Sequence, residues 1–520
     1  MTALQHHARQ WLPDYMQPGV WDELPRIPCS SNGKIDRAAL LAVPIQPTLP
    51  TACSAAQTPL QTQLTHLWIE LLALPTGELS IDESFFDLGG HSILLSTLLL
   101  RFREQFGRSF SLNHFIEAPT IRTLATLVEQ GERPDTSASQ AVRDAHRERI
   151  YNTLPENCVG DPHKVIVTGA NSFVGVHIVE ALLAKGATAV ACLVREKPGQ
   201  SAMARFTQAL REYRLEHLDL SRVQVFAADV SLPRLGLTSN AYETLAKEFG
   251  VLVHNAARVN HVLDYASLTR DNVDPVLECL RLCETHCKKV LNFVSTLSAS
   301  SSVDTQGYVL EAPAAATLPL YIKNGYNLSK WVAERQLARA VERGAWVNIH
   351  RPGNISFNSL TGVCQPQKNR LMLMLKGSLQ MGLLPKLALN FDLMPVDFLA
   401  RFIAFHCTRF QAGSSVFNLH NPQPLSWAHY LDGFSQAGHR FKRVSVEQWQ
   451  QSLHTISHDN ALFGVLGFYL GRLDEDIGDT SMIRYDNARQ AVQQMGAQYP
   501  EKDPALLSKG CDYLKATGFL

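Results

Sequence analysis

The chain has 520 residues, and its 48 lysines and arginines balance 48 aspartates and glutamates. This length predicts three or four domains with room for a large core. The balanced charge predicts neither nucleic acid nor a membrane as a partner. The N-terminus lacks a basic-then-apolar leader, and no apolar run reaches transmembrane length. The ten cysteines form no repeated pairs, which predicts a reducing, cytoplasmic setting.

One cysteine cluster could suggest a metal site. Cys279, Cys283 and Cys287 recur every four residues, with His286 beside the last. This spacing predicts one shared helical face, whereas metal sites draw ligands from several elements or from tight turns. Since free cysteine packs as a small hydrophobe, we expect core packing and no metal.

Two stretches are typical of linkers. Residues 44–59 are rich in Pro, Thr and Ala, and residues 130–149 are mostly polar. They divide the chain into three predicted parts: residues 1–45, residues 59–131 and residues 151–520.

The first part is too short for a core of its own. Its runs Leu-Pro-Asp-Tyr-Met-Gln-Pro (12–18) and Asn-Gly-Lys-Ile-Asp-Arg (32–37) resemble the C-terminal edge of an adenylation domain of a nonribosomal peptide synthetase. In that family the lysine matching Lys34 reaches the acyl-adenylate. The large nucleotide-binding part is absent here, so we assign no adenylation. Lys34 is expected to be a remnant, or the chain to be the tail of a longer protein.

The second part has the helical period, with Leu60, Leu64, Leu67 and Leu71 on one face. It contains Phe-Phe-Asp-Leu-Gly-Gly-His-Ser-Ile (85–93), which places Ser92 at the start of an apolar helix. Helix N-termini favour phosphate, although a plain cap would also explain a serine there. The run resembles the phosphopantetheine attachment motif of thiolation domains. The resemblance implies a small four-helix carrier domain, a 4′-phosphopantetheine arm on Ser92 and a phosphopantetheinyl transferase as partner.

The third part alternates short apolar runs with helical patterns. This predicts an α/β fold, a Rossmann-type doubly wound parallel sheet with crossover helices. We expect a C-terminal substrate lobe after Leu384. The predicted strands are 164–168, 189–194, 223–227, 251–254, 290–294 and 347–350.

The first predicted strand runs into a glycine-containing turn and then a helix. Glycines at such a turn let the backbone approach a pyrophosphate at the helix N-terminus. Ser172 stands where the extended short-chain dehydrogenase pattern has glycine, and it either narrows the approach or bonds a phosphate. The expected cofactor-binding residues here are Gly169, Asn171, Ser172, Phe173, Val174 and Gly175.

Other strand ends complete the expected cofactor site. Arg195 stands where NAD-binding folds place an acidic residue on the ribose, and arginine pairs with a 2′-phosphate, so we expect NADPH. Asp229 ends the third strand, where it suits the adenine edge. Small residues after the fourth strand would let the cofactor pass close to the backbone; these residues are Asn255, Ala256 and Ala257.

The catalytic candidates are Thr296, Tyr326 and Lys330. Tyr326 and Lys330 are four residues apart and share a helical face. A lysine ammonium lowers the pKa of a nearby phenol, which makes the tyrosine a usable proton donor. Thr296 ends the preceding strand at the same sheet edge, and Ser295 and Ser298 leave the hydroxyl assignment open. Residues 351–355 end a later strand and are expected to border the nicotinamide.

The strings Gly-Tyr-Asn-Leu-Ser-Lys-Trp-Val-Ala-Glu (325–334) and Val-His-Asn-Ala-Ala-Arg-Val-Asn (253–260) resemble thioester reductase domains of the extended short-chain dehydrogenases. Such domains end nonribosomal synthetases and carboxylic acid reductases. The resemblance implies that Thr296, Tyr326 and Lys330 form the triad, with Tyr326 and Lys330 also meeting the cofactor. It further implies NADPH-dependent release of a carrier-bound acyl or peptidyl thioester as an aldehyde or alcohol, and an upstream adenylating or synthetase module as partner.

Two other classes of protein function stay open. One is a non-redox release domain that cyclises a thioester on the same fold, where loss of the tyrosine is expected. The other is a binding or scaffold protein with an inactive carrier. Tyr326 argues against the first and the intact Gly-Gly-His-Ser run (89–92) argues against the second.

Overall fold

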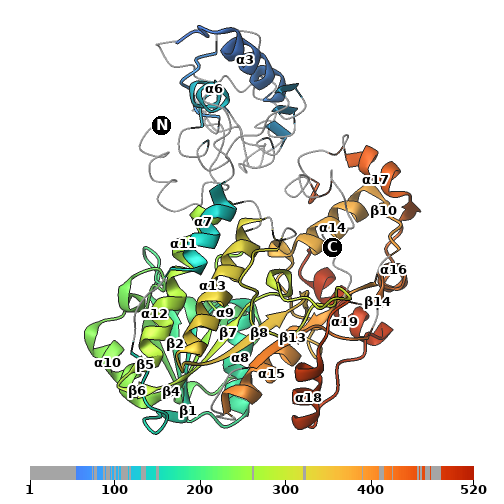
Figure 1. The fold of residues 1–520 in the computed structure, drawn as a ribbon. Helices are drawn as coiled ribbons and strands as arrows, with labels where there is room; N and C mark the ends of the chain where they lie inside the picture. The colour runs from blue at the N-terminus through green and yellow to red at the C-terminus, as the bar shows by residue number, and fades with distance from the viewer. Residues whose placement is uncertain are drawn as a thin grey trace, which may run out of the picture. The chain divides into compact units, whose positions relative to one another are not determined.

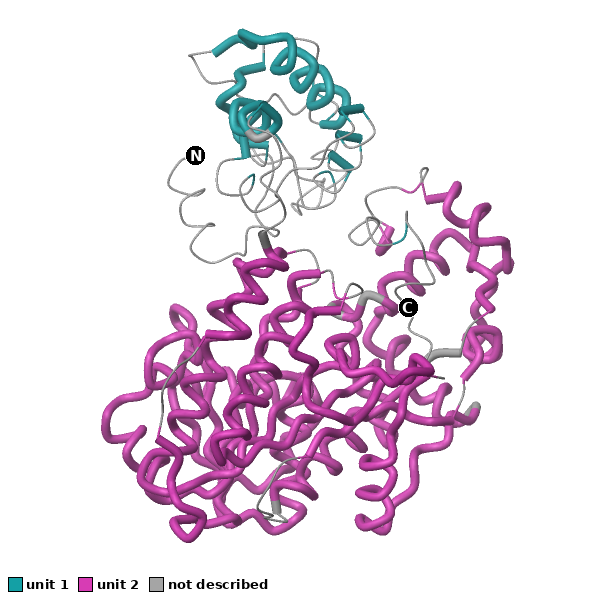
Figure 2. The backbone as a smooth tube through the Cα atoms, viewed as in Figure 1, with its two compact units in different colours: residues 1–134, 463–471 teal, residues 135–462, 472–520 magenta. Residues whose placement is uncertain are grey.

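The computed structural model describes residues 54–520 apart from several gaps. The gaps are 73, 75–78, 86–87, 89–93, 95–96, 99–100, 103–104, 107–114, 116–118, 130–135, 148–151, 261–262, 320–321, 323, 389, 409–414, 424, 454–455, 457–459, 463–468 and 470–481. The adenylation-like part with Lys34 and the carrier serine Ser92 therefore lie outside the described residues. The chain forms two compact units, residues 1–134 with 463–471, and residues 135–462 with 472–520 (Figure 2).

The first unit is helical where it is described. Helix α3 (Pro59–Leu71) begins at Thr58, whose hydroxyl accepts from the Gln61 amide, and it packs against α6 (Ile121–Glu129). Three buried aromatic rings meet edge to face at its centre, those of Trp68, Phe85 and Phe115. This small helical carrier region agrees with the expected helical bundle. The prediction of four helices involves residues outside the described ones.

The second unit is built on a seven-stranded sheet with the order β13-β8-β7-β4-β1-β2-β3, all of it parallel. The predicted Rossmann-type sheet and its six strands are confirmed. The strands are β1 (Asp161–Thr168), β2 (Ala189–Val194), β3 (Val223–Ala227), β4 (Phe249–His254), β7 (Val290–Val294), β8 (Trp346–Pro352) and β13 (Ser415–Leu419). Sequence reasoning missed β13, the edge strand beside β8.

Helices cover both faces of this sheet (Figure 1). On one face α8 (Phe173–Ala184) packs against β1, β2 and α15 (Val396–Thr408), and α9 (Ala202–Glu212) packs against β2 and β3. The other face carries α10 (Ser239–Glu248), α11 (Tyr265–Asn272), α12 (Asp274–Cys283) and α13 (Gly325–Glu342). Since the strands are parallel, their carboxyl ends all meet at one edge, where ligands bind in this class of sheet.

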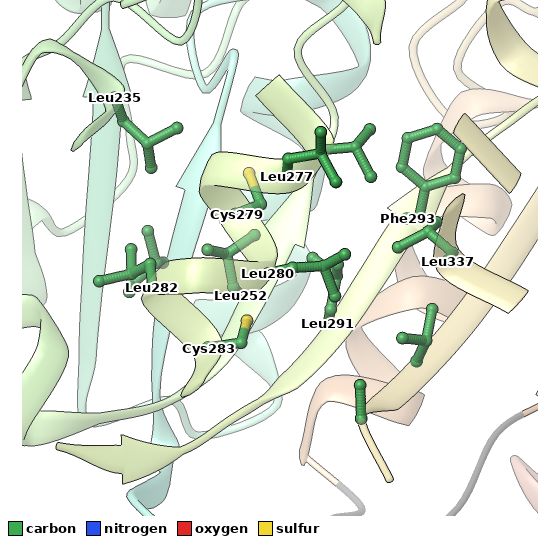
Figure 3. Close-up of a cluster of buried hydrophobic side chains, with 14 of the residues drawn as sticks. Leu235, Leu252, Leu277, Cys279, Leu280, Leu282, Cys283, Leu291, Phe293 and Leu337 are labelled. Carbon is green, nitrogen blue, oxygen red and sulfur yellow. The ribbon is translucent and has the colours of Figure 1, made fainter. Parts of the chain in front are cut away.

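The main core cluster lies between the sheet and α12 and α13. Leu252, Leu291 and Phe293 of the sheet pack there against Leu280 and Leu337 of the helices (Figure 3). All of these side chains are excluded from water, and burial of each contributes about 1.5–3 kcal/mol. The core thereby fixes α13 against the strand that ends next to Thr296.

The expected core packing of the cysteine cluster is confirmed, but the expected single helical face is not. Cys279 and Cys283 are buried in this core on α12, and burial raises the pKa of both thiols. Cys287 does not share their helical face, because α12 ends at Cys283 and a tight turn with His286 at φ 58° leads into β5 (Glu284–Thr285) and β6 (Cys287–Lys288). Among the described residues no group of three or more His, Cys, Asp or Glu side chains could hold a metal ion.

The predicted linker at 130–149 contains a helix. Residues Thr136–Ala145 form α7, which packs against α11 and α13 through the fully buried side chains of Ala141 and Ala145. The sequence did not predict this helix because its buried face consists of two alanines spaced four residues apart, which do not form a strong apolar pattern in a polar segment.

Shorter elements after β8 form the C-terminal lobe. Its helices are α14 (Arg370–Met381), α16 (Trp427–Gln436), α17 (Val446–Leu453), α18 (Asp486–Gln494) and α19 (Pro504–Ala516). Its two-residue and three-residue strands pair as β9 (Ile355–Ser356) with β12 (Met394–Pro395), β10 (Leu383–Pro385) with β15 (Lys442–Val444), and β11 (Asn390–Phe391) with β14 (Leu425–Ser426). None of the helices in the described part of the chain has the length and apolar character needed to cross a membrane.

Candidate active site

The turn between β1 and α8 is held in place by contacts that only glycine permits. Gly169 has φ +62°, and a Cβ there would lie 2.8 Å from Ala256 Cα on the strand-end loop of β4. A Cβ on Gly175 would lie 2.2 Å from the carbonyl oxygen of Gly169. The predicted glycine turn therefore forms at the N-terminus of α8.

Ser172 is the N-cap of α8, accepting a hydrogen bond from the Gly175 amide at 3.0 Å. Its hydroxyl also accepts from Asn255 Nδ2 at 3.0 Å, and the same amide group donates to the Gly169 carbonyl at 3.2 Å. Asn255 thus ties the end of β4 to the turn. The serine that replaces the pattern's glycine stabilises the helix start; a phosphate contact from it stays a prediction.

Beneath the turn lies a buried polar pair. Thr168 Oγ1 accepts from the backbone amides of Asn255 and Ala256, each at 3.1 Å, and lies 2.9 Å from His254 Nδ1. Burial, and then the charge of Lys330, lower the pKa of His254 to about 3, so its ring is neutral. These bonds fix the path of residues 254–257 past the glycine turn.

The remaining predicted turn residues support the loop. Phe173 is buried, with its ring 5.2 Å from that of Tyr213, the C-cap of α9. Asn171, Val174 and Ala257 are half-buried at the edge of the turn.

Arg195 lies in a cluster of opposite charges at the end of β2. Its guanidinium donates to Asp229 at 2.8 Å and to Asp271 at 3.3 Å, and Asp271 also pairs with Arg258 at 3.5 Å. Burial favours a higher pKa for Asp229, but hydrogen bonds from Ser231 and the charge of Arg195 hold this pKa below its usual value. Half of the Arg195 side chain is exposed, so it can still meet a ligand phosphate.

The predicted Tyr–Lys pair lies on α13, which begins with an Asn324 cap at the carboxyl edge of the sheet. Both side chains are buried. Lys330 Nζ donates to the carbonyl of Val294 at 2.8 Å and lies 4.6 Å from the centre of the Phe293 ring. The lysine is therefore held at the last residue of β7, two residues before Thr296.

The expected lowering of the tyrosine pKa is wrong for this conformation. Burial raises the pKa of the Tyr326 phenol. Burial also lowers the pKa of Lys330 to about 8, against the charge of Glu334. The cause is the removal of both side chains from water, and the Lys330 ammonium donates to the Val294 carbonyl.

The three candidate hydroxyls after β7 differ in their surroundings. Ser295 donates to the buried carboxylate of Glu334 at 2.5 Å. Thr296 is half-buried, Ser298 is exposed, and Thr296 Oγ1 accepts from the Ser298 amide at 3.4 Å. Their turn packs against α13.

Arg351 does not border an open site. Its guanidinium and the Glu334 carboxylate are fully buried and 2.6 Å apart, and it also donates to the carbonyls of Leu310 and Ala312. At Gly353 an added Cβ would lie 2.0 Å from Asp392 and 3.2 Å from Leu297. That residues 351–355 border the nicotinamide stays a prediction.

Asp392 is a residue of this region that sequence reasoning missed. It is buried and accepts from the amides of Asn354 and Asn421. Burial raises its pKa to about 6, while the same effect lowers that of nearby Lys502 to about 8. No motif surrounds Asp392, and only its place in the fold reveals that it fixes the Gly353–Asn354 turn beside Leu297.

Two family models match the chain. Residues 62–128 match a phosphopantetheine attachment site, and residues 167–403 match the NAD-binding family described as male sterility protein. The chain therefore combines a thiolation region with an NAD(P)-binding reductase region of the short-chain dehydrogenase type. This combination is like the C-terminal thiolation–reductase di-domain of nonribosomal peptide synthetases and aminoadipate reductases.

Particular relatives share this arrangement. A linear gramicidin synthase protein of Brevibacillus parabrevis is 29% identical over 537 residues, covering 99% of this chain but 10% of that protein. L-2-aminoadipate reductase large subunit of Penicillium chrysogenum is 28% identical, covering 99% of this chain and 41% of that protein. The chain thus spans less than half the length of either.

Solved structures agree. The terminal R domain from the myxalamid PKS-NRPS biosynthetic pathway has a TM-score of 0.65 and 27% identity, covering 74% of this chain and 99% of that one. A thiolation-reductase di-domain from an archaeal nonribosomal peptide synthetase has a TM-score of 0.68 at 20% identity and covers 90% of this chain and 99% of that one, which shows the same fold.

Proposed function

We propose that this protein releases an acyl or peptidyl group from its own carrier by reducing the thioester to an aldehyde with NADPH. The observation that carries the proposal is the placement of Lys330 and Tyr326. Both lie on one face of α13, and Lys330 is bonded to the last residue of β7. The helix thereby brings a phenol and an ammonium to the sheet edge that also holds the glycine turn.

The residues present fit a dinucleotide. At the start of α8 the backbone is packed so closely that a Cβ on Gly169 or Gly175 would collide with neighbouring backbone atoms. The N-terminal amides of a helix bind phosphate. Ala256 and Ala257, whose side chains are small, follow the end of β4 and are half-buried. Ala256 lies directly beside Gly169 of this turn. When bound, the reduced nicotinamide supplies the hydride for the thioester carbonyl.

The chain's own groups stabilise the negative charge that develops on the carbonyl oxygen. Tyr326 and Thr296 donate hydrogen bonds to that oxygen. Lys330 would hold the nicotinamide ribose, and its ammonium would favour proton transfer from Tyr326. Collapse of the hemithioacetal breaks the C–S bond, returns a proton to the arm's thiol and frees the aldehyde. Reduction of the aldehyde by a second NADPH would give the alcohol, which is the alternative product.

The choice of NADPH rests on Arg195. Its guanidinium is half exposed and already arranged by two carboxylates, Asp229 and Asp271. A 2′-phosphate offers a fork-shaped pair of acceptors that a ribose hydroxyl lacks.

The carrier supplies the substrate. Ser92 lies within the matched attachment region and bears the 4′-phosphopantetheine arm after modification by a phosphopantetheinyl transferase. An upstream adenylating or synthetase module loads the arm, as suggested by the adenylation-like residues 12–37. The named relatives are a synthase and a reductase, which supports this setting.

The test is a kinetic comparison with an acyl-pantetheine thioester and NADPH, with the aldehyde trapped and identified. Tyr326→Phe removes one hydroxyl and should lower turnover about 10²–10⁴-fold with NADPH binding retained. Thr296→Ala should lower turnover with less effect on binding, and Lys330→Ala should weaken both. Tyr242→Phe is the matched control, since that buried tyrosine lies on α10 in the main core. Release of a cyclised product without NADPH consumption would refute the proposal in favour of condensation.

A further inference from the structure

Helix α7, which follows the carrier in sequence, is fixed to the helix that carries Tyr326 and Lys330. Ala141 and Ala145 are fully buried in a cluster with Tyr265, Leu328 and Trp331. Polar contacts accompany this packing: Tyr265 donates to the Asp144 carboxylate at 2.9 Å, Gln336 to the Asp144 carbonyl at 3.3 Å, and Arg339 to the His146 carbonyl at 2.6 Å.

The direction of α7 follows from these pairs. Asp144 of α7 pairs with Gln336, and His146, which follows the end of α7, pairs with Arg339. Positions along the two segments therefore advance together, and the two helices run in parallel. Because α13 begins at the carboxyl edge of the sheet, the N-terminus of α7 points toward that edge (Figure 1). The chain from the carrier therefore enters the reductase unit on the side of its catalytic helix where the active site lies.

We propose that α7 is an anchor for the carrier's tether, which fixes the point of attachment at the catalytic edge so that the reductase acts preferentially on its own carrier. This inference rests on the proposed function, in which the carrier delivers the thioester. It assigns a role in substrate delivery to a segment outside the cofactor and catalytic residues.

The length of the tether gives the expected size of the effect. Helix α6 ends at Glu129 and α7 begins at Thr136, seven residue steps that span at most about 25 Å. Without docking of α7, the next described fixed point is Thr153, whose hydroxyl donates to the Arg343 carbonyl at 2.8 Å. The tether would then have 24 steps and a reach of about 85 Å. Effective concentration falls roughly as the −3/2 power of tether length, so delivery should weaken about sixfold.

The experiment compares two substrates of the full chain. One is an acyl group loaded on Ser92 with acyl-coenzyme A and a phosphopantetheinyl transferase; the other is a free acyl-pantetheine. Ala141→Asp should undock α7 and lower single-turnover reduction of the loaded carrier about sixfold, with the rate on free acyl-pantetheine unchanged. Val142→Asp is the matched control, because it adds the same charge at the neighbouring exposed position.

A second variant separates the tether from support of the catalytic helix. Insertion of 17 Gly and Ser residues after residue 131 lengthens the tether to 24 steps with α7 still docked, and it should lower only the loaded-carrier rate by a similar factor. Unchanged loaded-carrier rates in both variants would overturn the proposal. The proposal would also be overturned if Ala141→Asp lowered the reduction rate equally on both substrates and the insertion changed neither rate. Absence of NADPH-dependent reduction of either substrate by the wild type would instead refute the proposed function.

Discussion

Gly175 is the position where one added methyl group tests the cofactor turn most directly. In Gly175→Ala the new Cβ would lie 2.2 Å from the Gly169 carbonyl oxygen and 2.9 Å from two backbone atoms of Ala170. Carbon and oxygen atoms in contact are more than 3 Å apart, and backbone atoms cannot rotate away as a flexible side chain does. The start of α8 must therefore shift by nearly 1 Å.

Such overpacking costs about 1–3 kcal/mol. The shifted turn relieves part of this strain in the free protein, but cofactor binding requires the close approach of its amides. If the whole cost appears in binding, the dissociation constant for NADPH rises about 5- to 150-fold, since each 1.4 kcal/mol is tenfold. Fluorescence titration with NADPH measures this constant, and thermal unfolding shows that the variant is folded.

Gly186→Ala is the control at the other end of the same helix. Gly186 has φ +91°, and no atom lies within 4 Å of the position that an added methyl group would take, so alanine there strains the backbone without a collision. It should lower the melting temperature and leave the dissociation constant unchanged. A cooperatively folded Gly175→Ala protein that binds NADPH as tightly as the wild type would show that this turn does not hold the cofactor.

Three further outcomes are expected. Arg195→Ala should lose about 1.5–3 kcal/mol of NADPH affinity with NADH affinity unchanged, and equal wild-type dissociation constants for the two cofactors would contradict the assignment. Because the pKa of Lys330 is lowered to about 8, its ammonium loses its proton as the pH rises through that value, and NADPH affinity should fall above pH 8. Lys330→Arg should flatten the pH dependence of NADPH affinity. A wild-type affinity that is already constant from pH 7 to 9 would exclude a role of the Lys330 charge in cofactor binding. Glu334→Gln should lower the free energy of unfolding by about 3–5 kcal/mol, because it leaves the fully buried Arg351 charge without the opposite charge beside it. Denaturant titration measures this free energy. A loss below 1 kcal/mol would mean that this pair is not buried in solution.

The sequence by itself determined the features that depend on neighbours along the chain. A strand followed by a turn with Gly169 and Gly175 is readable because a tight strand-to-helix turn needs glycine where a Cβ would collide. The common face of Tyr326 and Lys330 follows from the helical period alone. The parallel sheet follows from alternating strand and helix patterns, and six of its seven strands were predicted on that basis.

The tertiary structure alone decided what the functional residues touch. The direction of the Lys330 ammonium depends on which carbonyl the packed sheet brings near it, and the raised rather than lowered pKa of Tyr326 follows from the burial of its phenol. Arg351 meets Glu334 across 17 residues, and Asp392 meets Asn354 across 38. Tyr265 meets Asp144 of α7 across 121 residues. Periodicity reports which face of an element is buried, but it does not report the partner, because the partner is chosen only when distant segments pack together.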